Sequence, residues 1–138
     1  MTLTRYMLPL LLLAATTHAA DFSGRYVCEG RDAREGKYAG IVTLDRVPEH
    51  SRESHDAYRF TLTVPGFGRY EGQAVGRGRH LGVHFALTDQ TDKDYGTGLA
   101  TFTRLRDGRW SFSKFYYEPE YHGGNHGLES CVQERPVR

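Results

Sequence analysis

Residues 58–64 read Tyr58-Arg59-Phe60-Thr61-Leu62-Thr63-Val64, and their apolar and polar side chains alternate without a break. Because successive side chains of a β-strand point to opposite faces, this pattern predicts a strand with one buried and one solvent-facing side. The same period of two returns at residues 80–88 and 109–113. No window shows a convincing helical period, so the alternation predicts an all-β protein.

Turn-forming residues divide the chain into eight such segments. We expect strands at residues 24–29, 37–47, 56–64, 69–76, 80–88, 97–106, 109–117 and 127–133. The connections are short, and Asp107-Gly108 is typical of a two-residue type I′ hairpin turn. Consecutive strands with short connections predict an antiparallel meander, in a single domain that covers residues 20–138.

The two cysteines of the chain, Cys28 and Cys131, lie near the two ends of this domain. In an oxidising compartment such a pair predicts a disulfide. If it joins the first and last strands, their Cα atoms lie within about 7 Å and the sheet must return to its own beginning. The sequence therefore predicts a closed up-and-down antiparallel β-barrel of about eight strands, which has no exposed edge. The alternative is a two-sheet sandwich with the disulfide between its layers.

Residues 1–19 have the features of a signal peptide. Arg5 precedes an apolar run over residues 7–15, and Thr17-His18-Ala19 supplies the small residues of a cleavage site. The run is shorter than the roughly 20 residues that span a bilayer. We therefore expect cleavage after Ala19 and a protein of the periplasm, or a secreted one, with no membrane span.

The charge of the domain is balanced. The full chain has 18 Lys and Arg against 17 Asp and Glu, and Arg5 is the one charged residue of the expected signal peptide. A net charge near zero argues against nucleic-acid binding.

The charges are nevertheless divided between the two ends of the expected barrel. Alternate connections of an up-and-down barrel meet at one end, which here collects residues 30–36, 65–68, 89–96 and 118–126. This end is rich in Asp and Glu, and the opposite end is rich in Arg. Such a division favours a basic or cationic partner at the acidic end.

The last of these connections combines Tyr, Glu, His and Gly residues. Tyrosine gives rigid amphipathic contact area, and glycine lets the backbone turn tightly. We therefore predict a partner-binding rim that consists of Asp92, Asp94, Tyr95, Glu118, Glu120, Tyr121, His122 and His126. His and Glu are also metal ligands, but Gly123-Gly124 disfavours the helix that would align a His-x₃-His pair, so no metal or other cofactor is predicted.

Catalysis finds little support in the sequence. Ser51, Ser54, His50, His55 and Asp56 have the residue types of a nucleophile and its base. They share one polar loop, without the strained turn that presents a nucleophile. We expect that the protein is not an enzyme.

Two family resemblances bear on function. Phe22-Ser23-Gly24-Arg25-Tyr26 resembles the start of lipocalin and avidin barrels, where Gly-x-Trp opens the first strand. This resemblance implies a small-ligand pocket inside the barrel. Its lining would be Tyr38, Tyr58, Phe60, Leu62, Tyr70, Phe85, Phe102, Trp110 and Phe112.

The second resemblance is to the periplasmic C-type lysozyme inhibitors, which are small exported β-barrels. Tyr26-Val27-Cys28 and Cys131 are similar to that family's early Tyr-x-Cys and late cysteine. This resemblance implies that the acidic end binds a basic enzyme.

These observations together predict a monomeric, non-enzymatic binding protein of the bacterial envelope that uses its acidic end. One alternative is an inhibitor or immunity protein against a basic envelope enzyme or toxin. Another is a carrier of a small apolar ligand or of a metal ion.

Overall fold

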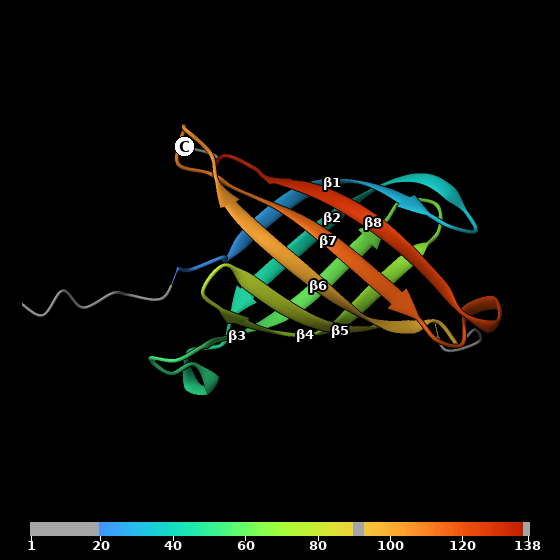
Figure 1. The fold of residues 1–138 in the computed structure, drawn as a ribbon, viewed down its shortest axis with the longest axis horizontal. Coiled ribbons are helices and arrows are strands. Elements are labelled where there is room, and N and C mark those ends of the chain that lie inside the picture. The colour runs from blue at the N-terminus through green and yellow to red at the C-terminus, as the bar shows by residue number, and fades with distance from the viewer. Residues whose placement is uncertain (1–19, 90–92, 137–138) are drawn as a thin grey trace, which may run out of the picture.

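The computed structural model describes residues 20–89 and 93–136 of this chain. They form one antiparallel β-barrel, in which each strand pairs with its neighbours in the sequence and the last pairs with the first (Figure 1). The strands are β1 (Gly24–Asp32), β2 (Gly36–Arg46), β3 (Asp56–Val64), β4 (Gly68–Arg77), β5 (His80–Leu87), β6 (Tyr95–Arg104), β7 (Trp110–Glu118) and β8 (Asn125–Gln133). The predicted closed up-and-down barrel is confirmed. The expected signal peptide and its cleavage site lie outside the described residues.

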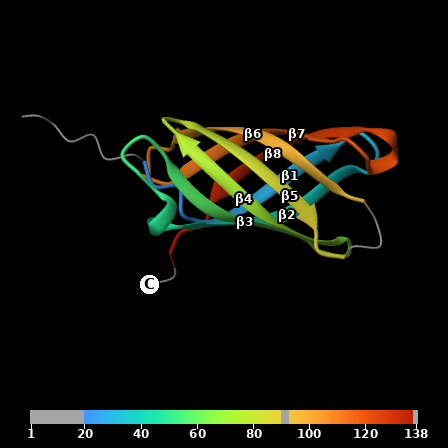
Figure 2. The ribbon, with the colours of Figure 1, turned by 90° about the horizontal axis from the view of Figure 1, so that it is seen from below.

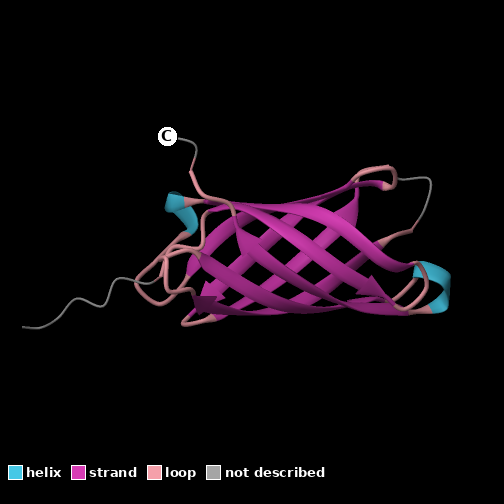
Figure 3. Ribbon diagram, turned by 90° about the horizontal axis from the view of Figure 1, so that it is seen from above, coloured by secondary structure: helices cyan, strands magenta, loops and turns pink. Residues whose placement is uncertain are grey.

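Two single turns of 3-10 helix, η1 (Pro48–His50) and η2 (Tyr121–Gly123), lie in the connections. Figure 3 shows them at opposite ends of the barrel. The end with η2 also holds the β1–β2, β3–β4 and β5–β6 connections, as the alternation of turns in an up-and-down barrel requires (Figure 2). Neither helical turn has the length or apolar composition that crossing a membrane requires, and no other helix lies within the described residues.

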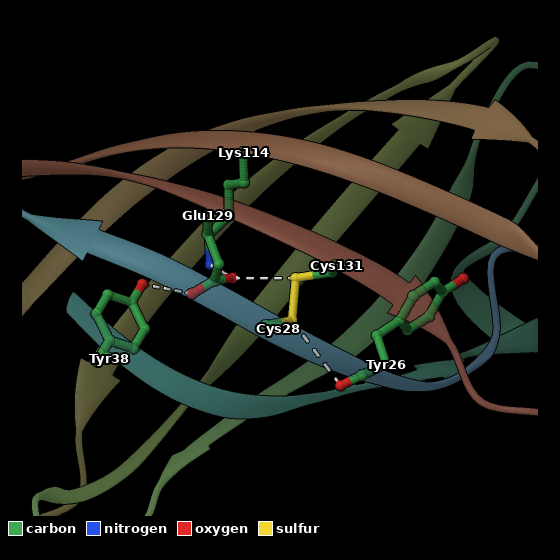
Figure 4. The surroundings of a disulfide bond; sticks show 6 residues. All are labelled: Tyr26, Cys28, Tyr38, Lys114, Glu129 and Cys131. Atoms are coloured by element: carbon green, nitrogen blue, oxygen red, sulfur yellow. Dashed lines mark hydrogen bonds and ion pairs between the residues drawn. A yellow bond between two sulfur atoms is a disulfide. The ribbon is translucent and has the colours of Figure 1, made fainter.

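The disulfide closes the barrel. Cys28 and Cys131 are direct register partners between β1 and β8, and their sulfur atoms are bonded with the Cα atoms 4.1 Å apart. Figure 4 shows the bond on the inside of the barrel wall. The predicted disulfide between the first and last strands is confirmed, and the alternative two-sheet sandwich is excluded.

The turn between β6 and β7 differs from the prediction. Gly108 has a φ of 88°, but Asp107 does not have the positive φ that a type I′ turn needs. The amide of Gly108 donates to the carbonyl of Leu105 over 3.0 Å, so the connection is a four-residue turn with glycine in its last position. The predicted two-residue type I′ hairpin is wrong because only one residue of the turn takes a left-handed conformation.

The segment before β1 closes the end of the barrel that holds η1. Phe22 is buried, its ring stacks on Phe102 with 3.9 Å between centroids, and Trp110 meets it edge-on. The phenol of Tyr26 donates to the carbonyl of Phe22, whose own amide donates to the Tyr58 oxygen. Aromatic side chains thus pack this half of the interior.

Candidate functional site

The interior opens into a pocket of about 400 Å³ at the acidic end of the barrel. This volume lies within the range of roughly 300–1,000 Å³ that is usual for small-molecule sites. Apolar contacts come from Leu62, Val64, Pro65 and Gly66. The remaining lining consists mainly of five carboxylate side chains and six aromatic rings, namely Asp32, Glu35, Asp94, Glu118 and Glu129 with Tyr38, Phe67, Tyr70, Phe85, Tyr116 and Tyr121.

The pocket also has a lateral opening. The β2–β3 ladder reaches only as far as Ile41 opposite Thr63, so residues 36–40 of β2 are paired with β1 alone. The pocket lining includes Lys37 and Ala39, which are exposed on that part of β2. Solvent therefore reaches the interior between β2 and the β3–β4 turn.

Glycines on β1 and β8 make room for two of the tyrosine rings. Gly30 is the register partner of Tyr38, and Gly127 is the register partner of Tyr116. A Cβ at either glycine would overlap the facing ring, so each ring occupies the space that a larger residue would need. Pairing an aromatic residue across from glycine covers the exposed backbone and fixes the ring.

Four tyrosine hydroxyl groups of the pocket lining each donate to a carboxylate of the lining. Burial first, and then the adjacent carboxylate, raise the pKa of each of these phenols above its usual value. The phenols therefore remain protonated, and each O–H is committed as a donor. The pairs are Tyr38 with Glu129 at 2.6 Å, Tyr70 with Asp94 at 2.6 Å, Tyr116 with Asp32 at 2.7 Å, and Tyr121 with Glu35 at 2.8 Å.

Asn125 links two of the carboxylates. Its Nδ2 donates to Asp32 over 2.8 Å and to Glu118 over 2.7 Å. Its Oδ1 is buried and has no hydrogen-bond partner among the described residues. Asp32 also accepts the backbone amides of Arg34 and Glu35, which shapes the tight β1–β2 turn. Burial acts to raise the pKa of Asp32, but its hydrogen bonds together outweigh burial and hold that pKa below the usual value.

A buried ion pair forms the floor of the pocket. Lys114 on β7 and Glu129 on β8 are register partners, 2 % and 1 % exposed, with 2.8 Å between Nζ and Oε1. The ammonium group also lies over the rings of Phe60 and Phe85, at 4.9 and 5.7 Å from their centroids. Figure 4 shows Glu129 between Lys114, Tyr38 and the disulfide. Both charges are therefore compensated inside the barrel.

Glu118 is the carboxylate whose charge depends most on its surroundings. Burial raises the pKa of Glu118 to about 7, and the negative charges of Asp94 and Asp32 add to the effect. The hydrogen bond from Asn125 and the charge of Lys114 oppose it. This side chain therefore gains or loses its proton near neutral pH.

We expect Glu118 to make the stability of the barrel fall with rising pH. Its pKa is about 7 in the folded protein against 4.5 for an ordinary Glu, so between these values the folded state binds more protons than the unfolded state. Stability should therefore fall as pH rises from about 4.5 to about 7, by about 3 kcal/mol in total. Glu118→Gln should remove most of this slope and be the more stable protein at about pH 8.

Urea unfolding of both proteins over this pH range measures the effect. Glu53→Gln is the matched control because Glu53 is an exposed residue of the connection before β3. Its pH profile should follow that of the unsubstituted protein. Superimposed profiles for Glu118→Gln and the unsubstituted protein would show that Glu118 titrates as it does in the unfolded chain.

The structure separates the members of the predicted rim. Asp94 and Glu118 are buried in the pocket wall, whereas Glu120 is exposed and accepts the hydroxyl of Tyr95 over 3.1 Å. Lys93 lies 3.5 Å from the same glutamate. The predicted rim residue Asp92 lies outside the described residues.

The rim histidines lie in different elements. His122 is exposed in η2 with a φ of 46°, and its carbonyl accepts Arg34. His126 is an exposed residue of β8, with its ring 6.3 Å from that of Phe115. Within the described residues, Glu129 and the two cysteines are the one group of three ligand-type side chains whose atoms lie within 4.8 Å of one another. The cysteine sulfurs are bonded to each other and offer no thiolate.

The aromatic lining predicted for a small-ligand pocket is divided between pocket and core. Tyr38, Leu62, Tyr70 and Phe85 line the pocket. The other predicted side chains are buried or half-buried in the core, and they are Tyr58, Phe60, Phe102, Trp110 and Phe112.

The interior charges were not among the predicted site residues. Cysteines that bond across neighbouring strands share one face, and an apolar disulfide is expected on the buried face. Counting in steps of two from Cys28 and Cys131 then places Asp32 and Glu129 inside as well. The same count along β7 from Phe112 reaches Lys114, Tyr116 and Glu118. The period of two could therefore have located these groups.

Comparisons with protein-family models and with curated proteins return no match for this chain.

Proposed function

We propose that this protein is a non-enzymatic binding protein that holds a small molecule in the pocket at the acidic end of its barrel. The observation that carries the proposal is an open volume of about 400 Å³ inside a barrel whose other half is packed with aromatic side chains. Eight strands leave room either for packed side chains or for one small ligand. In this barrel, packed side chains fill one half of the interior and the open pocket occupies the other half.

The buried charges of the pocket support the same proposal. Burying a charged group costs free energy unless it is paired and hydrogen-bonded, and apolar replacements of buried ion pairs are often as stable or more so. Asp32, Asp94, Glu118, Lys114 and Glu129 are all buried at this end. An arrangement of this kind contributes little to stability, so ligand recognition is the better account of it.

The loop that offered catalytic residue types has a structural role in the described residues. Ser51 is buried, its hydroxyl donates to the carbonyl of Val47, and it accepts the amide of Ala57. These bonds fix the connection between η1 and β3 and leave the hydroxyl unsuited to attack a substrate. They support the non-enzymatic part of the proposal.

Location in the periplasm or outside the cell belongs to the proposal as well. The Cys28–Cys131 disulfide supports it, because disulfides persist mainly in oxidising compartments.

A basic protein bound at the acidic end is the second candidate function. It would include an inhibitor or immunity protein against an envelope enzyme or toxin. The observation that favours it is the exposed set of rim side chains, such as Glu120 and His122, outside the pocket. Such a partner would depend on these exposed residues rather than on the interior.

Filling the pocket should abolish small-ligand binding. Val64 is half-buried on β3 and lines the pocket, so Val64→Trp would place an indole in the ligand volume without removing a carboxylate. Val75 faces outward on β4 and is 52 % exposed, which makes Val75→Trp the matched control. Native mass spectrometry of proteins isolated without refolding should show a stoichiometric small-mass adduct on the unsubstituted protein and on Val75→Trp, and none on Val64→Trp.

A bare unsubstituted protein would contradict the proposal and favour a protein partner. Its mass would equal the calculated mass less the two hydrogens lost in the disulfide. An adduct retained in full by Val64→Trp would place the ligand outside the pocket.

A further inference from the structure

We propose that the ligand is an organic cation, with a protonated amine attached to an apolar or aromatic body. This inference rests on the proposed function, because it names the class of molecule that the pocket holds. Four features of the pocket support it. They are the hydrogen-bond donors that already have protein acceptors, the charge of the buried carboxylates, the spacing of those carboxylates and the aromatic rings beside them.

The tyrosine and asparagine donors at the pocket wall are committed to protein acceptors. The hydroxyls of Tyr38, Tyr70 and Tyr116 donate to Glu129, Asp94 and Asp32. Both N–H groups of Asn125 are also used, on two carboxylates. Carboxylate and phenol oxygens accept more than one hydrogen bond, so these tyrosine, asparagine and carboxylate groups keep acceptor capacity but no donor capacity. A ligand that supplies donors fits them better than a ligand that needs donors.

The charge of the interior also favours a ligand that is a cation. Lys114 is paired with Glu129 at 2.8 Å, so its positive charge is already compensated there. Asp32 and Glu118 are further carboxylates of the pocket that are buried. Lys37 also lines the pocket, but it is exposed at the lateral opening, where solvent screens its charge. The interior therefore has excess negative charge, which a cation would neutralise.

The spacing of these carboxylates favours an organic cation over a bare metal ion. Their oxygen atoms do not form a group in which all lie within 4.8 Å of one another. A metal ion needs its ligand atoms at about 2.0–2.6 Å, which demands a tighter cluster. An ammonium group attached to a larger body can instead reach one or two carboxylates and fill the rest of the volume.

Aromatic rings supply the surface for that body. Tyr70 and Phe85 meet edge-on at 5.7 Å between centroids, and Phe67 stacks parallel to Tyr70 at 6.3 Å. Phe67 belongs to the β3–β4 turn beside the lateral opening and is 50 % exposed. Rings attract a cation through their faces and shield apolar groups from water.

Binding of a cation should release a proton from Glu118 near neutral pH. Burial keeps the pKa of Glu118 near 7 in the free protein. The titratable and hydrogen-bonding groups that interact with it are Asn125, Asp94, Asp32, Lys114, Tyr70 and Tyr116. A positive ligand beside it favours the ionised carboxylate. Affinity for an amine should therefore rise as pH increases from about 6 to about 8.

Three probes of similar size and different charge test the inference, namely 2-phenylethylamine, 2-phenylethanol and 3-phenylpropionate. Isothermal titration calorimetry of the protein should give an affinity for the amine at least about ten-fold above that for the alcohol, and no binding of the acid. Glu118→Gln should reduce the amine affinity at about pH 8 and remove most of its pH dependence, since the variant carries no titrating group there. Val64→Trp should abolish amine binding, and Val75→Trp should not.

Failure of this inference and failure of the proposed function give different results. If the alcohol or the acid binds as well as the amine, and Val64→Trp abolishes that binding, the pocket holds small molecules but not cations. If no probe binds while the co-purified adduct is lost in Val64→Trp, the amine class is likewise wrong and the pocket remains a ligand site. Amine binding that survives Val64→Trp would place the cation elsewhere on the surface and overturn the inference.

Discussion

Lys114→Met should destabilise the barrel by about 3–5 kcal/mol at neutral pH, which is the usual loss when one partner of a buried ion pair is removed. Glu129 is 1 % exposed, and its charge is balanced by Lys114 at 2.8 Å. After the substitution its remaining hydrogen-bond donor among the described residues is the hydroxyl of Tyr38. Denaturant unfolding at neutral pH measures the loss.

Two further variants separate charge from packing. Lys114→Met combined with Glu129→Leu replaces both charges by apolar side chains and should recover most of the stability. Arg25→Met removes an ion pair with Glu134 that is short, at 2.7 Å, but exposed, and should cost no more than about 1 kcal/mol. A loss for Lys114→Met as small as that for Arg25→Met would mean that water reaches the buried pair and screens it.

Removing the disulfide should have an effect of similar size. Cys28 and Cys131 are 103 residues apart in the sequence, and in the chain-entropy model a loop of about this length stabilises the folded state by about 4–5 kcal/mol. Cys28→Ala combined with Cys131→Ala should therefore shift the denaturation midpoint to much lower denaturant concentration. The strand pairing between β1 and β8 should remain the native one once the protein is folded.

A reducing agent provides the control for this variant. It should destabilise the unsubstituted protein to the level of the double alanine variant and leave that variant unchanged. Equal midpoints for the oxidised protein and the double variant would show that the paired strands close the barrel without help from the bond.

Most of the fold could be predicted from the sequence, because period-two alternation and the cysteine pair both depend on local geometry. The strand predicted at residues 56–64, around the alternation from Tyr58 to Val64, has the same bounds as β3, which runs from Asp56 to Val64. The disulfide then required the first and last strands to meet, which left the closed barrel as the simplest topology. The predicted turn at Asp107-Gly108 was wrong because its backbone depends on four residues rather than two.

The candidate site was only partly predictable. Sequence reasoning placed Asp94 and Glu118 at the acidic end. The period of two could have shown that Glu118 faces inward, but Asp94 lies in the connection before β6, where no alternation indicates burial, and charged residues are almost never fully buried unless they are paired. The pairing itself is a property of the closed barrel. Lys114 and Glu129 become register partners only when β7 and β8 are side by side, and Tyr38 reaches Glu129 from β2 across β1.

The charged side chains of the pocket affect both the stability of the fold and the binding of a ligand. Charges that contribute little net stability are kept at the acidic end, while the end that Phe22 closes is packed with aromatic rings. Substitutions at the charged end should therefore change ligand binding more than substitutions of exposed residues around η1.

Mapping the amine on the folded protein tests the central claim most directly. A titration of the ¹⁵N-labelled protein with 2-phenylethylamine, followed by ¹H–¹⁵N correlation NMR, reports where the ligand lies. We expect saturable shifts at the backbone amides of Tyr38, Tyr70, Lys114 and Glu118, with the amides around Phe22 and His50 unchanged. Shifts confined to the outer wall near Leu99 and Leu128, or no saturable shift at all, would contradict the claim.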